Sequence, residues 1–242
     1  SSVTEITIDG CQFDTTMKNS IDSSDSKRIT LKNSNFVNLQ SQSGGLMMNL
    51  TTHAETVVLD NITVSQSGAV YRPPRLIQLT DFGGTLVSLR NVRASNISIS
   101  TSLLGFYNYP TTNPTVTLEQ CQFDDVKVDG LASYGLELPG VLNVSIVDSV
   151  FSRFQVAESS FMFLKQEAPQ ADGRCNITSS QFWGPANTSV WLQVNSNVTL
   201  NMKDVMVRDV KTNGALWVYG TNLTVSNVSI LSCSSIKNLV VL

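Results

Sequence analysis

The chain has 242 residues, with 16 Lys plus Arg and 19 Asp plus Glu, so its formal net charge is −3 and only 14% of its residues are charged. We expect no nucleic-acid partner, because neutralising phosphates needs a basic surface and the sequence pI is about 5.1. The hydrophobic fraction is 41%. No apolar run approaches the roughly 18 residues of a membrane-spanning helix, so we expect no membrane span in this segment.

His53 is the only histidine in the chain. Ser-His-Asp or Cys-His catalysis would therefore need His53 itself, and a His-rich metal site is not expected. We interpret His53 as a solvated loop residue, because it lies in the polar run 51–55. The sequence contains no phosphate-binding loop, dinucleotide fingerprint, zinc spacing or EF-hand loop, so we predict neither a cofactor nor a metal.

A repeat runs through the sequence and sets the expected architecture. Its clearest copies are residues 7–14, TIDGCQFD, and residues 117–124, TLEQCQFD. In each copy an apolar residue is followed five positions later by a second one. In chain order these pairs are Ile8/Phe13, Leu31/Phe36, Leu59/Val64, Leu89/Ala94, Leu118/Phe123, Ile146/Phe151, Ile177/Phe182, Met202/Val207 and Val225/Ile230. Their mean spacing of about 27 residues lets nine repeats fill the chain.

A further apolar segment precedes the pair in most repeats. These segments are short, alternate with a period of two and contain many β-branched residues, which predicts strands rather than helices. In chain order they cover residues 45–50, 76–79, 103–106, 136–138, 161–164, 190–194 and 215–219. Three short strands would form one turn of a solenoid, and nine turns stacked at about 4.8 Å would give a rod on the order of 40 Å long.

This pattern resembles the right-handed parallel β-helix of the pectin-lyase-like superfamily over essentially the whole chain. Residues 44–46 (GGL) and 213–216 (NGAL) are similar to the Gly-Gly-apolar repeats of large β-helical surface proteins, such as bacterial polymorphic membrane proteins and protist surface proteins. The Phe-x-x-Asn motif of the bacterial group is missing. We predict an all-β fold, a right-handed parallel β-helix solenoid of about nine rungs of about 27 residues, with residues 1–242 as a single β-helix domain.

Equivalent positions of stacked turns form columns. The position after the first apolar residue alternates in charge through Asp9, Lys32, Asp60, Arg90 and Glu119. This predicts a surface ladder of opposite charges that satisfy one another, rather than an ion-binding stripe.

The next column is rich in residues that tolerate the left-handed backbone region, as a tight corner requires. Its members are Gly10, Asn33, Asn61, Asn91, Gln120, Asp148, Ser179, Asp204 and Asn227. This column resembles the asparagine ladder of the superfamily, whose stacked amides hydrogen-bond from turn to turn.

Nine Asn-x-Ser/Thr sequons occur where the composition predicts about four by chance. They indicate a glycosylated protein of the secretory pathway, although strands rich in Asn, Ser and Thr also generate sequons. The outward or loop positions are the main glycosylation candidates, and they are Asn49, Asn143, Asn176, Asn187, Asn197 and Asn222. Asn61 and Asn227 rank lower because they are expected at corners, and Asn96, which is undecided, is grouped with them.

The four cysteines fall on inward positions of separate repeats. The closest are two turns apart, roughly 9 to 10 Å, which exceeds the Cα separation of about 7 Å that a disulfide allows. We therefore predict four unpaired, buried cysteines, although an even number of cysteines in a secreted protein usually indicates pairing.

An enzyme of this fold is expected to cluster acids on the outer face of the strand before the repeat motif. That face offers one carboxylate, Glu137, whereas glycoside hydrolysis commonly uses two within about 5 to 9.5 Å. The acids at 124, 125 and 129 and the acids at 204 and 209 are better explained as solvated loop residues. Aromatic residues on the same face suggest a surface, which either binds a partner or sugar or is covered by the protein's own loops, and they are Phe163, Trp191, Trp217 and Tyr219.

These patterns favour a non-catalytic extracellular or cell-surface glycoprotein with a structural, adhesive or filament-forming role. The alternative is a carbohydrate-active β-helix enzyme of the lyase or hydrolase kind, and a phage or virus fibre is disfavoured by the sequons. The chain begins at Ser1 and ends in a strand-like run at residues 236–242, so we expect a segment of a longer or multi-subunit assembly. Other subunits or continuing chain are therefore the expected partners at the rod ends, with carbohydrate as a further candidate.

Overall fold

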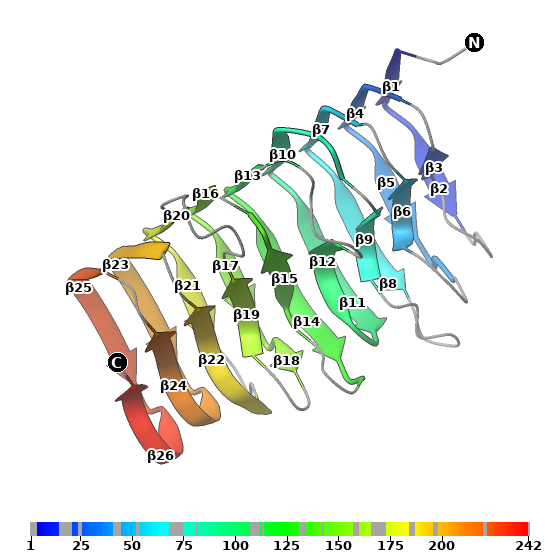
Figure 1. Cartoon of the computed structure of the whole chain (residues 1–242). Coiled ribbons are helices and arrows are strands. Elements are labelled where there is room, and N and C mark those ends of the chain that lie inside the picture. The colour runs from blue at the N-terminus through cyan, green and yellow to red at the C-terminus, as the bar shows by residue number, and fades with distance from the viewer. Residues whose placement is uncertain are drawn as a thin grey trace.

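The structure of the chain is a computed structural model that describes residues 4–14, 21–23, 26–40, 45–51, 54–67, 75–80, 82–106, 112, 114–130, 134–141, 143–156, 160–165, 173–183, 187–195, 198–219 and 222–241. The regular secondary structure of these residues consists of β-strands alone. Successive turns of the chain stack into a rod, with the two termini at opposite ends (Figure 1). The all-β, parallel β-helix prediction is confirmed.

A 17-stranded parallel sheet contains the first two segments of each turn. The first segments are β1 (Glu5–Asp9), β4 (Arg28–Lys32), β7 (Thr56–Asp60), β10 (Leu86–Arg90), β13 (Thr115–Glu119), β16 (Asn143–Val147), β20 (Gly173–Thr178), β23 (Val198–Arg208) and β25 (Leu223–Leu231). The second segments are β2 (Gln12–Asp14), β5 (Asn35–Val37), β8 (Thr63–Ser67), β11 (Arg93–Ile99), β14 (Gln122–Val128), β17 (Val150–Ser152), β18 (Gln155–Val156) and β21 (Gln181–Trp183). In the last two turns β23 and β25 continue through the second segment without a break.

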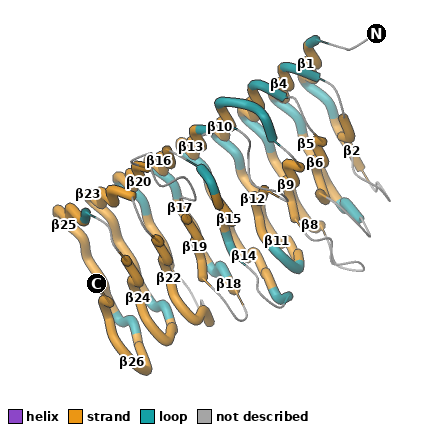
Figure 2. The backbone as a smooth tube through the Cα atoms, viewed as in Figure 1, coloured by secondary structure: helices purple, strands orange, loops and turns teal. Residues whose placement is uncertain are grey.

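A nine-stranded parallel sheet contains the third segment of each turn. Its strands are β3 (Ile21–Ser23), β6 (Gly45–Thr51), β9 (Arg75–Thr80), β12 (Ser102–Phe106), β15 (Leu136–Pro139), β19 (Ser160–Lys165), β22 (Asn187–Asn195), β24 (Lys211–Tyr219) and β26 (Ser234–Val241). Short loops connect these segments where the chain is described, and strands make up most of each turn (Figure 2).

The register between turns reproduces the predicted inward columns. One buried column, in which no member is more than 1% exposed, consists of Leu31, Leu59, Leu89, Leu118, Ile146 and Ile177. The alternation of inward and outward residues buries the second and fourth positions of β4, β7, β10, β13 and β16. The hydrophobic core therefore runs along the rod between the sheets.

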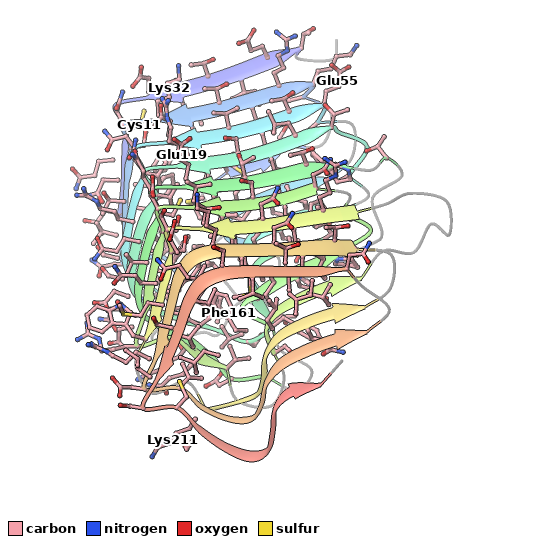
Figure 3. All side chains as sticks on the ribbon, turned by 90° about the vertical axis from the view of Figure 1, so that its left-hand side faces the viewer. Cys11, Lys32, Glu55, Glu119, Phe161 and Lys211 are labelled. Atoms are coloured by element: carbon pink, nitrogen blue, oxygen red, sulfur yellow. The ribbon has the colours of Figure 1, made fainter. Side chains whose placement is uncertain are left out.

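Phenyl rings stack along a second inward column. Phe151 lies 5.1 Å from Phe123 and 5.0 Å from Phe182, between ring centroids, and both neighbours are stacked on it. Phe154 and Phe161 approach the Phe151 ring edge-on at 6.2 and 4.9 Å. Figure 3 shows Phe161 between the two sheets. Aromatic contacts of these kinds stabilise a core beyond the area they bury.

The corner between the first and second segments has the predicted backbone conformation. All nine residues of the predicted column have positive φ angles, between 49° and 65°. We call this the first corner. A second corner, which the sequence did not predict, lies directly after β5, β17, β23 and β25 and inside β11 and β14. Its residues with positive φ are Asn38, Asn96, Asp125, Arg153, Asp209 and Ser232. Side chains that tolerate this region, mainly Asn and Asp, make both corners possible.

Candidate functional site

A polar cluster on the nine-stranded sheet is the most enclosed group of charged and amide side chains among the described residues. Arg75 of β9 reaches across β12 to Glu137 of β15, and its Nη2 lies 2.7 Å from Glu137 Oε2. The side chains of Arg75 and Glu137 are only 8% and 19% exposed. Ser102 donates a longer hydrogen bond of 3.4 Å to the same carboxylate oxygen.

Gly105 provides the space for this contact. Gly105 pairs with Gln78 on one side and Glu137 on the other, so it lies directly under the path from Arg75 to Glu137. A Cβ at Gly105 would be 2.4 Å from Arg75 Nε and 2.5 Å from Ser102 Oγ. A glycine is thus required because the guanidinium group passes so close to the backbone.

Amide side chains extend this cluster along the rod. Gln78 accepts a hydrogen bond of 3.4 Å from Arg75 and donates one of 3.2 Å to Asn49 on the preceding turn. Two turns beyond Glu137, Gln193 accepts a hydrogen bond of 3.0 Å from Ser160. The structure thus places the predicted outer-face residues Asn49, Gln78, Glu137 and Gln193 in one column, which we call the outer column.

The outer column offers little for acid–base chemistry on a sugar. The Glu137 carboxylate is held by Arg75 and Ser102. Asp22 is the other carboxylate that the register places in this column, but four turns separate β3 from β15. At about 4.8 Å for each turn this separation is roughly 19 Å, well beyond the 9.5 Å or so that an inverting glycosidase spans.

One acid of each predicted acidic patch is bonded to a neighbouring turn. Asp124 accepts a hydrogen bond of 2.5 Å from Ser152 and forms an ion pair with Arg153. Asp204 accepts a hydrogen bond of 2.7 Å from Asn227. Among the described residues, no three His, Cys, Asp or Glu side chains are close enough together to hold a metal ion.

The predicted charge ladder is present on the outer face of the 17-stranded sheet. The register aligns Asp9, Lys32, Asp60, Arg90 and Glu119 on successive turns. Arg90 binds Asp60 through two nitrogens, with Nε–Oδ1 3.1 Å and Nη2–Oδ2 2.5 Å. Lys32 and Glu119 lie along the same edge of the rod in Figure 3.

The Asp60 carboxylate is expected to make folding stability depend on pH. The hydrogen bond from Arg90 lowers the pKa of Asp60 below its usual value, and the positive charges of Arg90 and Lys32 act in the same direction. A lowered pKa in the folded state adds stability above the unfolded-state pKa of about 3.9, and that stability is lost as the pH falls through the folded-state pKa.

Asp60→Asn should therefore destabilise the protein at pH 7, and the difference from the wild type should disappear once Asp60 is protonated in both states. Urea unfolding of both proteins, at pH 7 and at successively lower pH, measures this change. A difference that stays constant down to the acid limit would contradict the role of the charge.

All four cysteines are unpaired, as predicted. Cys121 and Cys175 are buried, and burial raises the pKa of their thiols to about 11 and about 12. The prediction that all four are buried is wrong for Cys11, which is exposed, and for Cys233, which is half-buried. These two belong to the first and last described turns, where only one neighbouring turn covers the side chain.

Cys121 and Cys175 should respond differently to serine substitution. Cys121 Sγ donates to the carbonyl oxygens of Leu89 and Glu119, and the adjacent column member Ser149 donates in the same way to Val147. Cys121→Ser should thus change the free energy of unfolding by less than about 1 kcal/mol.

Cys175 lies between Val144 and Leu200 in an apolar column. Cys175→Ser should cost about 1 to 3 kcal/mol, because the new hydroxyl would be buried among apolar side chains. Urea unfolding measures both variants. Equal losses of unfolding free energy for the two variants would show that the first corner does not accept a hydroxyl at position 121.

The predicted glycosylation asparagines lie in different environments. Asn49, Asn143 and Asn176 are half-buried on strands, and Asn222 is exposed immediately before β25. Asn61, Asn96 and Asn227 are exposed at the two corners. Asn187 begins β22, but its side chain lies outside the described part, and Asn197 and His53 lie entirely outside it.

The register does not place the four predicted aromatic residues in one column. Phe163 and Trp217 share the outer column with Gln193 between them. Tyr219 is two residues further along β24, in the column of Asn195. Trp191 precedes Leu192, the partner of Met162, so its backbone is level with that of the buried Phe161.

Sequence reasoning missed two features of the surface. One is Arg75, whose contact with Glu137 joins residues 62 positions apart. The other is an exposed strip in the last turns, where the Arg208 guanidinium lies 4.9 Å from the centre of the Trp183 ring and Met206 and Leu231 are also exposed. Trp183 directly follows the inward-pointing Phe182, so the period of two could have identified it as an outward residue.

Residues 1–162 match the sequence model of a family described as a right handed beta helix region. This match covers about two thirds of the chain, and it includes the Arg75 and Glu137 cluster. No curated protein and no solved structure matches the chain significantly. None of the described residues belongs to a helix long and apolar enough to cross a membrane.

Proposed function

Because the chain belongs to the right-handed β-helix family, we propose that it works through its surface and not through catalysis, as an extracellular or cell-surface glycoprotein with a structural, adhesive or filament-forming role. One observation supports this role above others. Three arginine–carboxylate pairs on the outer faces bind charges of different turns to each other, namely Arg75–Glu137, Arg90–Asp60 and Arg153–Asp124. Such pairs hold neighbouring turns in register and leave less of each charge to act on a substrate.

Incubation of the purified protein with polyuronates and neutral polysaccharides tests the absence of catalysis. We expect neither new reducing ends nor unsaturated products. Turnover above a heat-inactivated control would overturn the proposal.

A carbohydrate-active enzyme is the second candidate, because Glu137 is a half-buried carboxylate that faces Arg75 on an outer sheet face. If turnover appeared, Glu137→Gln should abolish it, whereas Asp60→Asn on the other sheet should not. Loss of activity in Glu137→Gln alone would assign the reaction to this cluster. Retained activity in both variants would place the chemistry elsewhere.

The proposed role includes partners at the two ends of the rod, either other subunits or further turns of the chain. Apolar side chains of the core columns reach the surface in the first and last described turns. Ile8 and Phe13 are half-buried at one end, and at the other end Val225 is 51% exposed and Ile230 is half-buried. Another parallel turn would bury these side chains and pair the free strand edges.

The mass in solution over a range of protein concentrations tests these ends. Growth of the mass with concentration would support docking between copies. A monomeric mass at every concentration would contradict the filament-forming role. The proposed surface role would then rest on the glycans and the outer faces alone.

A further inference from the structure

The amide nitrogen of a sequon asparagine is the atom that carries an N-linked glycan. The hydrogen bonds of this nitrogen in the folded protein therefore affect whether a glycan fits there. Where a side-chain amide nitrogen bonds to another turn among the described residues, the acceptor lies on the preceding turn. The donors that follow this rule are Asn33, Asn38, Asn61, Gln78, Asn143, Asn201 and Asn227. Among the described sequon asparagines, the nitrogens of Asn61, Asn143 and Asn227 are engaged in this way.

Two exposed sequons have their nitrogens engaged in this way. Asn61 Nδ2 donates to Asn33 Oδ1 at 2.9 Å, and Asn227 Nδ2 donates to Asp204 Oδ1 at 2.7 Å. Both nitrogens face a neighbouring turn, and neighbouring parallel strands are only about 4.8 Å apart. A sugar would replace one of the two hydrogens of either nitrogen, next to the hydrogen that donates the ladder bond, and would therefore lie close to the neighbouring turn.

Two other exposed sequons differ in this respect. Among the described side chains, neither Asn96 nor Asn222 donates a hydrogen bond from its amide to another turn. Asn96 has the same backbone conformation as Asn61 and Asn227, with φ angles of 54°, 55° and 51°. Asn96 therefore matches Asn61 and Asn227 in exposure and backbone conformation, and Asn222 matches them in exposure, so the engagement of the amide nitrogen distinguishes the two groups.

Resting on the proposed function as a glycoprotein, we propose that the folded protein carries N-glycans at Asn96 and Asn222 and not at Asn61 and Asn227. Asn96 lies at the second corner, in β11. Asn222 lies immediately before β25, the first segment of the last turn. The two positions therefore belong to different parts of the turn. The first corner, with its asparagine ladder, stays free of sugar along its length.

Glycopeptide mapping of the chain, secreted in folded form from a eukaryotic host, tests this assignment. We expect glycan on the peptides with Asn96 and Asn222 and none on those with Asn61 and Asn227. Matched variants remove each sequon and keep its asparagine. Ser98→Ala and Thr224→Ala should each reduce the mass by one glycan, whereas Thr63→Ala and Ser229→Ala should leave the glycan mass unchanged.

Asp204→Gly tests the physical cause. Gly tolerates the positive φ at this position, and the substitution removes the acceptor of the Asn227 nitrogen. Asn227 should then carry glycan in the secreted protein. A folded Asp204→Gly variant in which Asn227 still carries no glycan would overturn the explanation.

The outcomes separate the inference from the function on which it rests. Glycan at Asn61 or Asn227 in the wild type, or none at Asn96 and Asn222 while other sequons are occupied, would overturn the inference alone. Absence of glycan from all nine sequons would overturn the glycoprotein role as well.

Discussion

Replacement of Leu118 by Asp is expected to abolish folding. Leu118 is 1% exposed, in the middle of the rod, and pairs with Leu89 on one side and Ile146 on the other. A charged carboxylate in this apolar column has no partner and costs several kcal/mol, which is of the order of the total stability of a typical domain. The β-sheet signal in circular dichroism should be lost, and the variant should be insoluble or degraded on expression.

Gln122→Asp provides the matched control. Gln122 is exposed on the same turn, and it pairs with Arg93 on the preceding turn. The same new charge at this position should change stability by no more than about 0.5 kcal/mol. A soluble, folded Leu118→Asp variant would show that this column does not face the core.

The repeated apolar pairs of the sequence were sufficient to predict the fold class and the register of the 17-stranded sheet. Each turn repeats the same contacts with its neighbours, so one short motif determines the position of Leu118 and of its equivalents. The first corner was predicted for a similar reason, because only a few residue types tolerate its backbone conformation.

The second corner was less accessible to sequence reasoning. Arg153 and Ser232 occupy positive φ there, and neither residue type signals a left-handed conformation. Their conformation follows from the path of the chain, since the amide of Arg153 must reach the carbonyl of Trp183 on the next turn. Such a bond depends on the length of the connection between turns, which varies along the chain.

The polar cluster of the outer column could be predicted only in part. The period of two places Gln78 and Glu137 on the outer face, but Arg75 has the same parity as the inward Ile77. Two consecutive residues, Leu76 and Ile77, are both buried, so the alternation is interrupted between Arg75 and Ile77. The reach of Arg75 across Gly105 is a tertiary contact that no local pattern contains.

Truncation of Phe151 to Ala is expected to cost about 3 to 5 kcal/mol, the range typical of a large aromatic side chain removed from a core. Phe151 is 1% exposed and contacts four other rings, two from the neighbouring turns of its own column and two from the wall of the core. The cavity would lie in the middle of the stack, where turns on both sides limit its collapse. Urea unfolding should show a lower midpoint with the same dependence on denaturant.

Phe13→Ala separates the stacking in the middle of the rod from the general effect of losing a phenyl group. Phe13 belongs to the same column and stacks on Phe36 at 4.5 Å, but it is half-buried in the first described turn. Its removal leaves a site that is open to solvent and not an enclosed cavity, so the loss should be clearly smaller than for Phe151→Ala. Equal losses for the two variants would mean that the column contributes uniformly along the rod, and that enclosure by neighbouring turns does not determine the stability of a ring in this core.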